Sequence, residues 1–250
     1  MKIFRTLQEL RQWRQETTGT VGFVPTMGAL HAGHGELLKQ ARKQNDFVVL
    51  SIFVNPTQFN NPSDFEKYPS TWEDDVALAK SFGVDVILSP PREDLYPDGY
   101  TYRVSEKDFS TILEGEFRPG HFDGVLTIVL KLFQLVKPTK AYFGEKDFQQ
   151  LALIQGMAKA FFLDLEIVPV ATVREESGLA MSSRNLRLTA EQRNQAAAIH
   201  RSLISAASAA EAQRQLEADG FKVEYVQDCQ GRRLVAAFLG EVRLIDNVTI

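Results

Sequence analysis

The sequence predicts an α/β fold with a doubly wound parallel sheet, followed by a second, smaller α+β domain. Short apolar runs of strand character alternate with longer runs of helical periodicity, and the connections between them are short. The run DFVVLSIFVNP, residues 46–56, is apolar on both faces, as a central strand of a parallel sheet is. After residue 174 the alternation stops. We therefore expect a Rossmann-like domain over residues 1–174 and a small C-terminal domain over residues 175–250.

Each expected element of the large domain has its own signal. The strand at 20–26 is rich in β-branched residues, and apolar residues at helical spacing follow it at 34–44. A helix at 70–83 has Ser70 or Thr71 as its N-cap and Gly83 just after its last turn. Further strands are expected at 84–90, 140–147 and 165–175, and further helices at 122–138 and 148–162.

The small domain is expected to combine helices with a few strands. Residues 189–220 are alanine-rich and helical in pattern. Two strand-like runs follow at 221–228 and 232–240.

Composition excludes several classes of function. The chain has 250 residues, of which 44% are hydrophobic and 24% charged, and its net charge of −4 argues against a nucleic-acid or anionic-membrane surface. Its one cysteine, Cys229, cannot form an internal disulfide and fits a reducing compartment. The longest apolar block is far shorter than a membrane span, and the N-terminus lacks a signal-peptide pattern. We expect a cytoplasmic, soluble protein.

The stretch VPTMGALHAGHGELL, residues 24–38, places two histidines between a strand and a helix. Helix N-termini at this edge of a doubly wound sheet bind phosphate well. Gly28 and Gly33 would let the backbone approach a ligand, and His31 and His34 could both donate to phosphate oxygens. The alternative is a glycine-rich turn with two half-exposed histidines. A metal site would need a third ligand, and the spacing is not that of a Walker A loop.

Two further blocks lie where a strand ends. SIFVNPTQF places Asn55 and Gln58 at the edge of the sheet, where neutral amides can hold hydroxyls and a carboxylate. FGEKDFQQL contains Lys146, a point charge suited to phosphate, and Asp147, which could cap the next helix or hold a ribose. Gln150 lies one turn later. Ordinary turns and a capped helix start are the alternatives.

Three more blocks have polar side chains in loops or at a helix start. MSSRN offers two hydroxyls and a cation for departing pyrophosphate, although it is also an ordinary N-cap. RPGHFDGV contains Arg118 and His121, which could equally brace their own loop. The acidic run Glu73, Asp74 and Asp75 could contact Mg²⁺, but we favour a solvated first helical turn.

These blocks together resemble a known enzyme family. HAGH after a first strand resembles the H-x-G-H signature of the nucleotidylyltransferase and class I synthetase superfamily. With SIFVNPTQF, RPGHFDGV, FGEKDFQQL and GLAMSSRN in that order, the sequence is similar to the pantothenate synthetase (pantoate–β-alanine ligase) family over roughly residues 20–190, and again at LIDN. Ser70 stands where that family usually has arginine and Ser177 where it usually has aspartate, and the C-terminal domain is shorter than is typical.

The resemblance implies an ATP-dependent ligase that condenses pantoate with β-alanine through a pantoyl adenylate, with Mg²⁺ on the phosphates and a homodimeric assembly. From the composition we expect no nucleic-acid or membrane partner, and no residue is assigned as a metal ligand. Pantoate would bind Gln58 and Gln150. The catalytic residues would be His34, His31, Lys146, Ser182, Ser183 and Arg184. ATP would contact Met27, Gly28, Ala29, Leu30, His31, Ala32, Gly33, His34, Gly144, Glu145, Lys146, Asp147, Val173, Met181, Ser182, Ser183 and Arg184.

Two other functions fit part of the pattern. A nucleotidylyltransferase would adenylate a phosphate, but Gln58 and Gln150 are neutral where a phosphate acceptor would favour cations. A non-catalytic ATP-binding module would not need the histidines, Lys146 and Arg184 intact. Because MSSRN lies beyond residue 174, we also expect the small domain to act as a lid.

Overall fold

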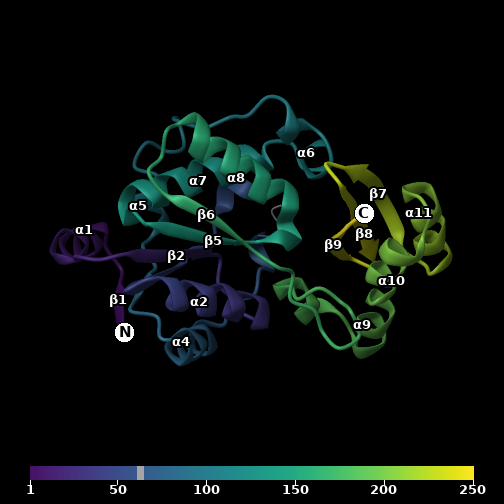
Figure 1. Cartoon of the computed structure of the whole chain (residues 1–250), viewed down its shortest axis with the longest axis horizontal. Helices are drawn as coiled ribbons and strands as arrows, with labels where there is room; N and C mark the ends of the chain where they lie inside the picture. The colour runs from purple at the N-terminus through teal and green to yellow at the C-terminus, as the bar shows by residue number, and fades with distance from the viewer. Residues whose placement is uncertain (61–64) are drawn as a thin grey trace. The chain divides into compact units, whose positions relative to one another are not determined.

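The computed structural model describes residues 1–60 and 65–250 (Figure 1). Its contacts form two compact units. The large unit comprises Met1–Gly144 and Gln149–Val170, and the small unit comprises Glu145–Phe148 and Ala171–Ile250. The predicted boundary after Arg174 placed residues Glu145–Phe148 in the large domain, whereas their contacts group them with the small unit.

The large unit is built on a six-stranded sheet in which every pair of neighbouring strands is parallel. The order is β1-β4-β3-β2-β5-β6. From β4 to β6 this is the doubly wound order, and the order in which successive strands are added reverses between β2 and β5. The predicted α/β fold is confirmed. The strands are β1 (Lys2–Phe4), β2 (Val21–Thr26), β3 (Phe47–Ile52), β4 (Val86–Leu88), β5 (Lys140–Gly144) and β6 (Glu166–Val170).

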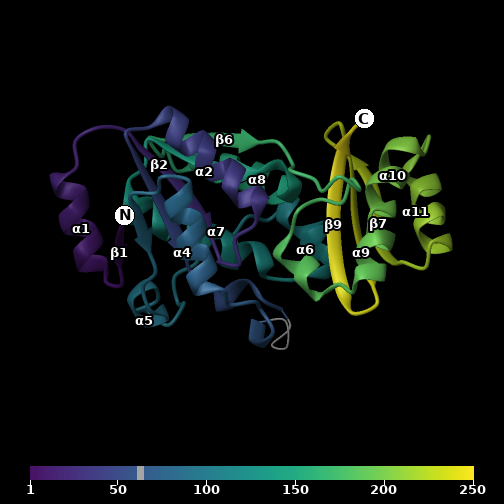
Figure 2. The same cartoon turned by 90° about the horizontal axis from the view of Figure 1, so that it is seen from below.

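Helices cover both faces of this sheet (Figures 1 and 2). Alternate residues of β3 point to opposite faces, so Val49 packs in one core cluster with α1 and α7, and Leu50 packs in another with α2 and α4. The helices and 3₁₀ turns are α1 (Leu7–Glu16), α2 (Ala32–Gln44), η1 (Pro56–Gln58), α4 (Trp72–Ser81), α5 (Arg92–Leu95), η2 (Phe109–Thr111), α6 (Glu114–Phe117), α7 (His121–Val136) and α8 (Phe148–Ala160).

The small unit packs helices on a three-stranded antiparallel sheet of order β7-β8-β9, which confirms the α+β expectation. The alanine-rich stretch is divided into three helices, and Ser208 caps the last of them by accepting from the N–H of Glu211. The elements are η3 (Glu145–Asp147), η4 (Ser183–Arg187), α9 (Ala190–Ala196), α10 (Ala198–Ser205), α11 (Ala209–Ala218), β7 (Lys222–Cys229), β8 (Arg232–Leu239) and β9 (Val242–Thr249). Within the described ranges, no helix has the length and hydropathy needed to cross a membrane.

Candidate active site

Two histidines cap the start of α2, the helix that follows β2. His31 is the N-cap residue, and its Nδ1 accepts from the backbone N–H of Gly33 at 3.1 Å. The backbone N–H of His31 in turn donates to Nδ1 of His34 at 3.3 Å. The pair thus forms a capping box with imidazoles in place of the usual oxygens. Their ring centroids lie 4.1 Å apart.

The caps determine which nitrogen of each ring can donate. Because Nδ1 of both His31 and His34 accepts a hydrogen bond, the proton of each neutral ring is on Nε2. Each imidazole therefore presents an Nε2–H donor. Both rings follow the carboxyl end of β2, and the ladder between β2 and β5 ends at Phe23–Ala141, before either strand does. This reversal in strand order is where doubly wound sheets bind ligands.

The loop between β2 and α2 is held by a buried carboxylate. Asp75 on α4 is 2% exposed and accepts from the backbone N–H groups of Ala29 at 2.9 Å and Leu30 at 2.7 Å. Its Oδ1 also accepts from the Thr71 hydroxyl at 3.0 Å. Ala29 has a φ of +49°, a left-handed conformation that is unfavourable for a residue with a Cβ. Asp75 therefore supports a strained main chain next to His31.

This arrangement corrects one prediction. Glu73 and Asp74 are exposed, but Asp75 does not belong to a solvated helical turn, because its oxygens bind the loop. Gly28 adopts a φ of +83°, and a Cβ there would lie 3.0 Å from Oδ2 of Asp75, so the fold itself favours glycine at this position. The approach of a ligand to Gly28 stays a prediction.

A chain of buried polar groups orients the Gln58 amide. Asn55, 1% exposed, donates from Nδ2 to Oε1 of Gln58 at 3.0 Å and to the Gly124 carbonyl at 3.2 Å. Oδ1 of Asn55 accepts from the Tyr96 hydroxyl at 2.8 Å. Burial raises the pKa of Tyr96 to about 12, so the hydroxyl stays protonated at neutral pH. The oxygen of Gln58 therefore faces Asn55, and its Nε2 lies 3.1 Å from Sδ of Met27.

Arg118 and His121 brace the same loop. Nδ1 of His121 lies 2.8 Å from the Gln58 carbonyl oxygen, which can only accept, so Nδ1 carries the proton. Nε2 then accepts from Nη1 of Arg118 at 3.1 Å, and Arg118 also pairs with Glu114 at 3.4 Å. His121 is therefore neutral and buried, and it contacts the main chain of Gln58 as well as Arg118 in its own loop. At Gly124 the absence of a side chain lets α7 approach η1 closely, because a Cβ would lie 2.4 Å from the Thr57 carbonyl oxygen.

The two neighbouring glutamines at the start of α8 differ in role. Gln149 is 3% exposed, accepts from the N–H of Glu114 and donates to the carbonyls of Phe109 and Ile112. Its side chain is therefore used within the protein. Gln150 is half-buried. Of the two, Gln150 is the one suited to contact a ligand.

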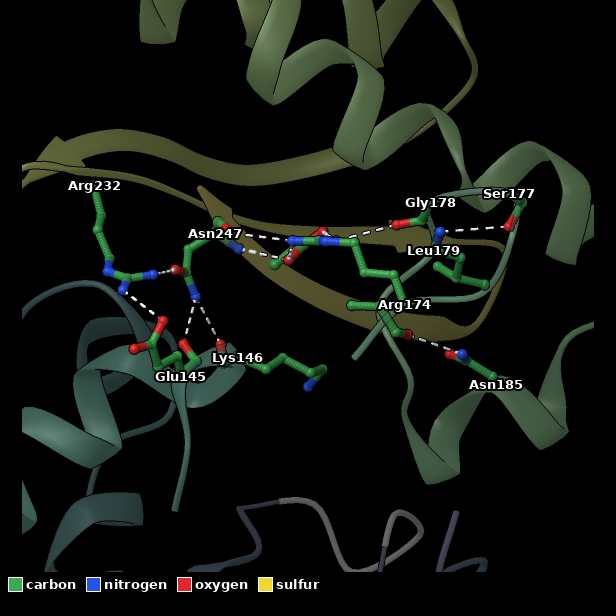
Figure 3. A network of polar contacts seen from close by, with 11 residues as sticks. Glu145, Lys146, Arg174, Ser177, Gly178, Leu179, Asn185, Arg232 and Asn247 are labelled. Atoms are coloured by element: carbon green, nitrogen blue, oxygen red, sulfur yellow. Dashed lines mark hydrogen bonds and ion pairs between the residues drawn. The ribbon is translucent and has the colours of Figure 1, made fainter. Parts of the chain in front are cut away.

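Lys146 lies in η3, which belongs to the small unit (Figure 3). Its Nζ is 3.7 Å from Oδ2 of Asp147. The carbonyls of Glu145 and Lys146 each accept from Nδ2 of Asn247 at 2.9 Å. The turn that carries this cation is thus attached to the last strand, β9.

The MSSRN loop follows a tight hairpin in the same unit. The N–H of Met181 donates to the Val173 carbonyl at 2.9 Å, and the Ser182 hydroxyl oxygen accepts from the N–H of Arg184 at 3.2 Å as the cap of η4. The hydroxyl of Ser177 accepts from the N–H of Leu179 at 3.4 Å (Figure 3). Serine at position 177 therefore closes the hairpin turn.

The predicted site residues are divided between the two units. The large unit holds Met27–His34, Gln58, Gly144 and Gln150, and the small unit holds Glu145–Asp147, Val173 and Met181–Arg184. Among the residues that the structure describes, no group of three or more His, Cys, Asp or Glu side chains could hold a metal ion.

Sequence reasoning missed several residues that hold these loops. Asp75 was considered as a metal contact or as part of a solvated helical turn, Tyr96 and Arg232 were not singled out, and Asn247 entered only through LIDN. No local pattern marks the first three. The return of family resemblance at LIDN was the one available signal for Asn247.

Comparisons with known proteins agree on one family. The family model described as pantoate-beta-alanine ligase matches residues 2–249. A curated pantothenate synthetase of Bdellovibrio bacteriovorus is 64% identical over 249 residues, covering 100% of this chain and 99% of that protein. One of Legionella pneumophila is 52% identical, with 99% of both chains covered. These coverages show that the C-terminal domain is not shortened relative to these two proteins.

Solved structures give the same result. The pantoate-beta-alanine ligase of Francisella tularensis, solved in complex with β-γ ATP and β-alanine, has a TM-score of 0.96 and 43% identity, covering 100% of this chain and 97% of that one. The pantothenate synthetase of Thermus thermophilus has a TM-score of 0.91 and 42% identity, covering 100% and 99%.

Proposed function

The chain belongs to the pantoate–β-alanine ligase family, and we propose that it carries out the ATP-dependent ligation of that family in two steps. In the first, the pantoate carboxylate attacks the α-phosphorus of ATP, the bond to the β-phosphate breaks, and pyrophosphate leaves. In the second, the amine of β-alanine attacks the acyl carbon of pantoyl adenylate, loses a proton and expels AMP. Neither step needs a covalent nucleophile from the protein, so catalysis consists of positioning and charge stabilisation.

His34 and His31 are assigned to the charge that develops on phosphate in the first step. The observation that carries this assignment is the imidazole capping box, which leaves Nε2–H of both rings as the donor. Donors fixed before the reaction stabilise developing charge without reorganisation. Met27–Gly33 are assigned to ATP, because they form the loop and the first residues of α2 at the point where the strand order reverses.

Gln58 and Gln150 are assigned to pantoate. The fixed amide of Gln58 offers its Nε2 donor, and a neutral donor can hold a carboxylate without an ion pair that would have to break during attack. Alanine at either position should weaken pantoate binding about tenfold, because one stranded hydrogen bond amounts to roughly that factor. Calorimetry should show nucleotide affinity nearly unchanged, and an equal loss for ATP would contradict the assignment.

Lys146, Ser182, Ser183 and Arg184 are assigned to the phosphates and the departing pyrophosphate. Gly144, Glu145, Asp147, Val173 and Met181 are assigned to ATP through their loops. Mg²⁺ is assigned to the reaction as part of the Mg–ATP substrate. The use of Asp75 as a brace for the loop supports that assignment, because its oxygens are already bound.

The small domain, residues 175–250, is assigned the role of a lid. The histidines and the cations lie in different compact units, so one ATP molecule can use both sets only if the units come together during the reaction. Closure would also keep water from the acyl adenylate. Limited proteolysis between about residues 174 and 185 should be suppressed by saturating ATP and pantoate. Equal cleavage with and without them would rule out the lid.

We also propose a homodimeric assembly and a cytoplasmic location. The family resemblance supports a homodimer, which light scattering of the purified protein would test. A single cysteine and the absence of a membrane-crossing helix from the described residues support a cytoplasmic location. Fractionation of cells would test it.

Pyrophosphate exchange tests the whole scheme. Labelled pyrophosphate should enter ATP when pantoate is present and β-alanine is absent. Exchange that requires β-alanine would exclude an adenylate formed before the amine reacts. Exchange supported by a phosphorylated acceptor in place of pantoate would indicate a nucleotidylyltransferase, and ATP binding without exchange would indicate a binding module.

A further inference from the structure

The side-chain amide of Asn247 is fully used within the small unit (Figure 3). Asn247 lies on β9 and is 2% exposed. Its Nδ2 donates to the carbonyl oxygens of two consecutive residues, Glu145 and Lys146, at 2.9 Å each. Its Oδ1 accepts from Nη1 of Arg232 at 2.7 Å. An amide is the only natural side-chain group of this size that can donate twice on one side and accept on the other.

Arg232 holds the same turn at a second point. Its Nη2 donates to Oε2 of Glu145 at 2.8 Å, and its guanidinium lies 4.9 Å from the ring centroid of Phe148. Arg232 and Asn247 thereby attach main chain, carboxylate and ring of Glu145–Phe148 to β8 and β9. These contacts explain why Glu145–Phe148 belong to the small unit, although β5 before them and most of α8 after them belong to the large unit.

Asn247 is itself held rigidly. Its backbone N–H donates to Oδ1 of Asp246 at 2.8 Å, and its carbonyl accepts from Nη2 of Arg174 at 3.3 Å. Arg174 also forms a two-pronged pair with Asp246, at 2.6 and 3.0 Å. A support that is fixed by its own hydrogen bonds can define the position of the group it holds.

We propose that Asn247 is a positioning residue for ATP. It fixes the main chain of η3, and with it the point from which the Lys146 ammonium reaches a phosphate. This inference rests on the proposed function, in which Lys146 binds ATP. The LIDN segment thereby takes part in nucleotide binding, although it lies more than a hundred residues from Lys146 in the sequence.

Asn247→Asp is the most direct test. The carboxylate has nearly the same shape and still accepts from Arg232, but it cannot donate to the carbonyls of Glu145 and Lys146. The ATP KM should rise about tenfold, because the fixed position of the cation is lost, while the pantoate KM changes less than about twofold. Asn194→Asp is the matched control, because Asn194 is exposed on α9 and undergoes the same change of charge in the same unit. It should leave both KM values unchanged.

A double-mutant cycle with Lys146→Ala separates positioning from general stability. If Asn247 acts through Lys146, then Asn247→Asp should add little to the ATP KM of Lys146→Ala. Independent, multiplicative losses would overturn the inference, as would an unchanged ATP KM in Asn247→Asp. If Lys146→Ala alone leaves the ATP KM unchanged, the proposed function of Lys146 fails, and the inference falls with it.

Folding of the variants is checked by circular dichroism and thermal unfolding. If Asn247→Asp does not fold, Arg232→Met decides the question, since Arg232 is partly exposed and holds the same turn through Glu145. It should raise the ATP KM in the same direction, by a smaller factor, and an unchanged ATP KM would overturn the inference.

Discussion

Replacing Asp75 with asparagine tests whether a buried carboxylate on α4 holds the loop that leads to His31. Oδ1 of Asp75 accepts from the N–H of Leu30 and the hydroxyl of Thr71, and Oδ2 accepts from the N–H of Ala29. Asparagine keeps one oxygen, which in the better orientation retains the first two contacts. Its NH₂ group then opposes the N–H of Ala29, which loses its acceptor.

The expected loss of stability corresponds to this one hydrogen bond of Ala29. One lost hydrogen bond to a charged group amounts to about 1.5–3 kcal/mol in the free energy of unfolding. For a chain of this length that corresponds to a fall in Tm of about 3–12 °C. Because Ala29 is left-handed and its N–H is then unsupported, the loop should also shift. A displacement of the His31 cap would lower kcat/KM by about tenfold to a hundredfold.

The matched control is Asp74→Asn, one residue earlier on the same helix. Asp74 is exposed, so the same change of charge there should alter stability by less than about 0.5 kcal/mol. Thermal unfolding and steady-state kinetics would be measured on both variants. Equal Tm values for the two would refute the bracing role. A changed Mg²⁺ requirement in Asp75→Asn at unchanged Tm would instead identify a metal contact.

Three further predictions follow from contacts in the two units. His34→Asn keeps an acceptor for the α2 cap but removes the Nε2–H donor. The rate of adenylate formation in a single turnover should therefore fall by a factor of about 10²–10³. A rate within a few-fold of wild type would reject His34 as the donor. Gly124→Ala should lower the free energy of unfolding by about 1–3 kcal/mol, because its Cβ would meet the backbone of Thr57. Gly156→Ala on α8 has open space around its Cβ and should be neutral or stabilising. Chemical denaturation would compare the two variants, and equal free energies of unfolding would contradict the close packing of α7 on η1. Burial, and then Arg174, lower the pKa of His200, only partly offset by Asp246. The folded state thus favours the neutral ring, and stability that is complete above about pH 6.5 should be lost as the pH falls through the lower folded pKa. His200→Gln should flatten that slope in denaturation curves measured from pH 7.5 to 5, and an unchanged slope would exclude His200 as its source.

The sequence determined those parts of the fold in which local pattern and final environment coincide. The run at 46–56 is apolar on both faces because β3 is buried on both faces, and Gly83 follows the last turn of α4 with a left-handed φ of +70°, as its position predicted. β1 was missed because it has only three residues, and β9 because its alternating pattern is mixed with polar residues, of which Asn247 binds η3. The break before α11 depends on Ser208, whose capping role competes with a continuous helical pattern.

The same division holds for the candidate site. The residues proposed to contact ATP and pantoate lie in short sequence motifs that carry the family resemblance, so the sequence was sufficient to predict them. What holds those blocks was decided by the tertiary structure alone. Asp75 binds Leu30 across 45 residues, and Asn247 binds Lys146 across 101. A side chain's chemistry states which hydrogen bonds it can make, but its partner depends on which distant segment the fold brings within about 3 Å, and no local pattern encodes that choice.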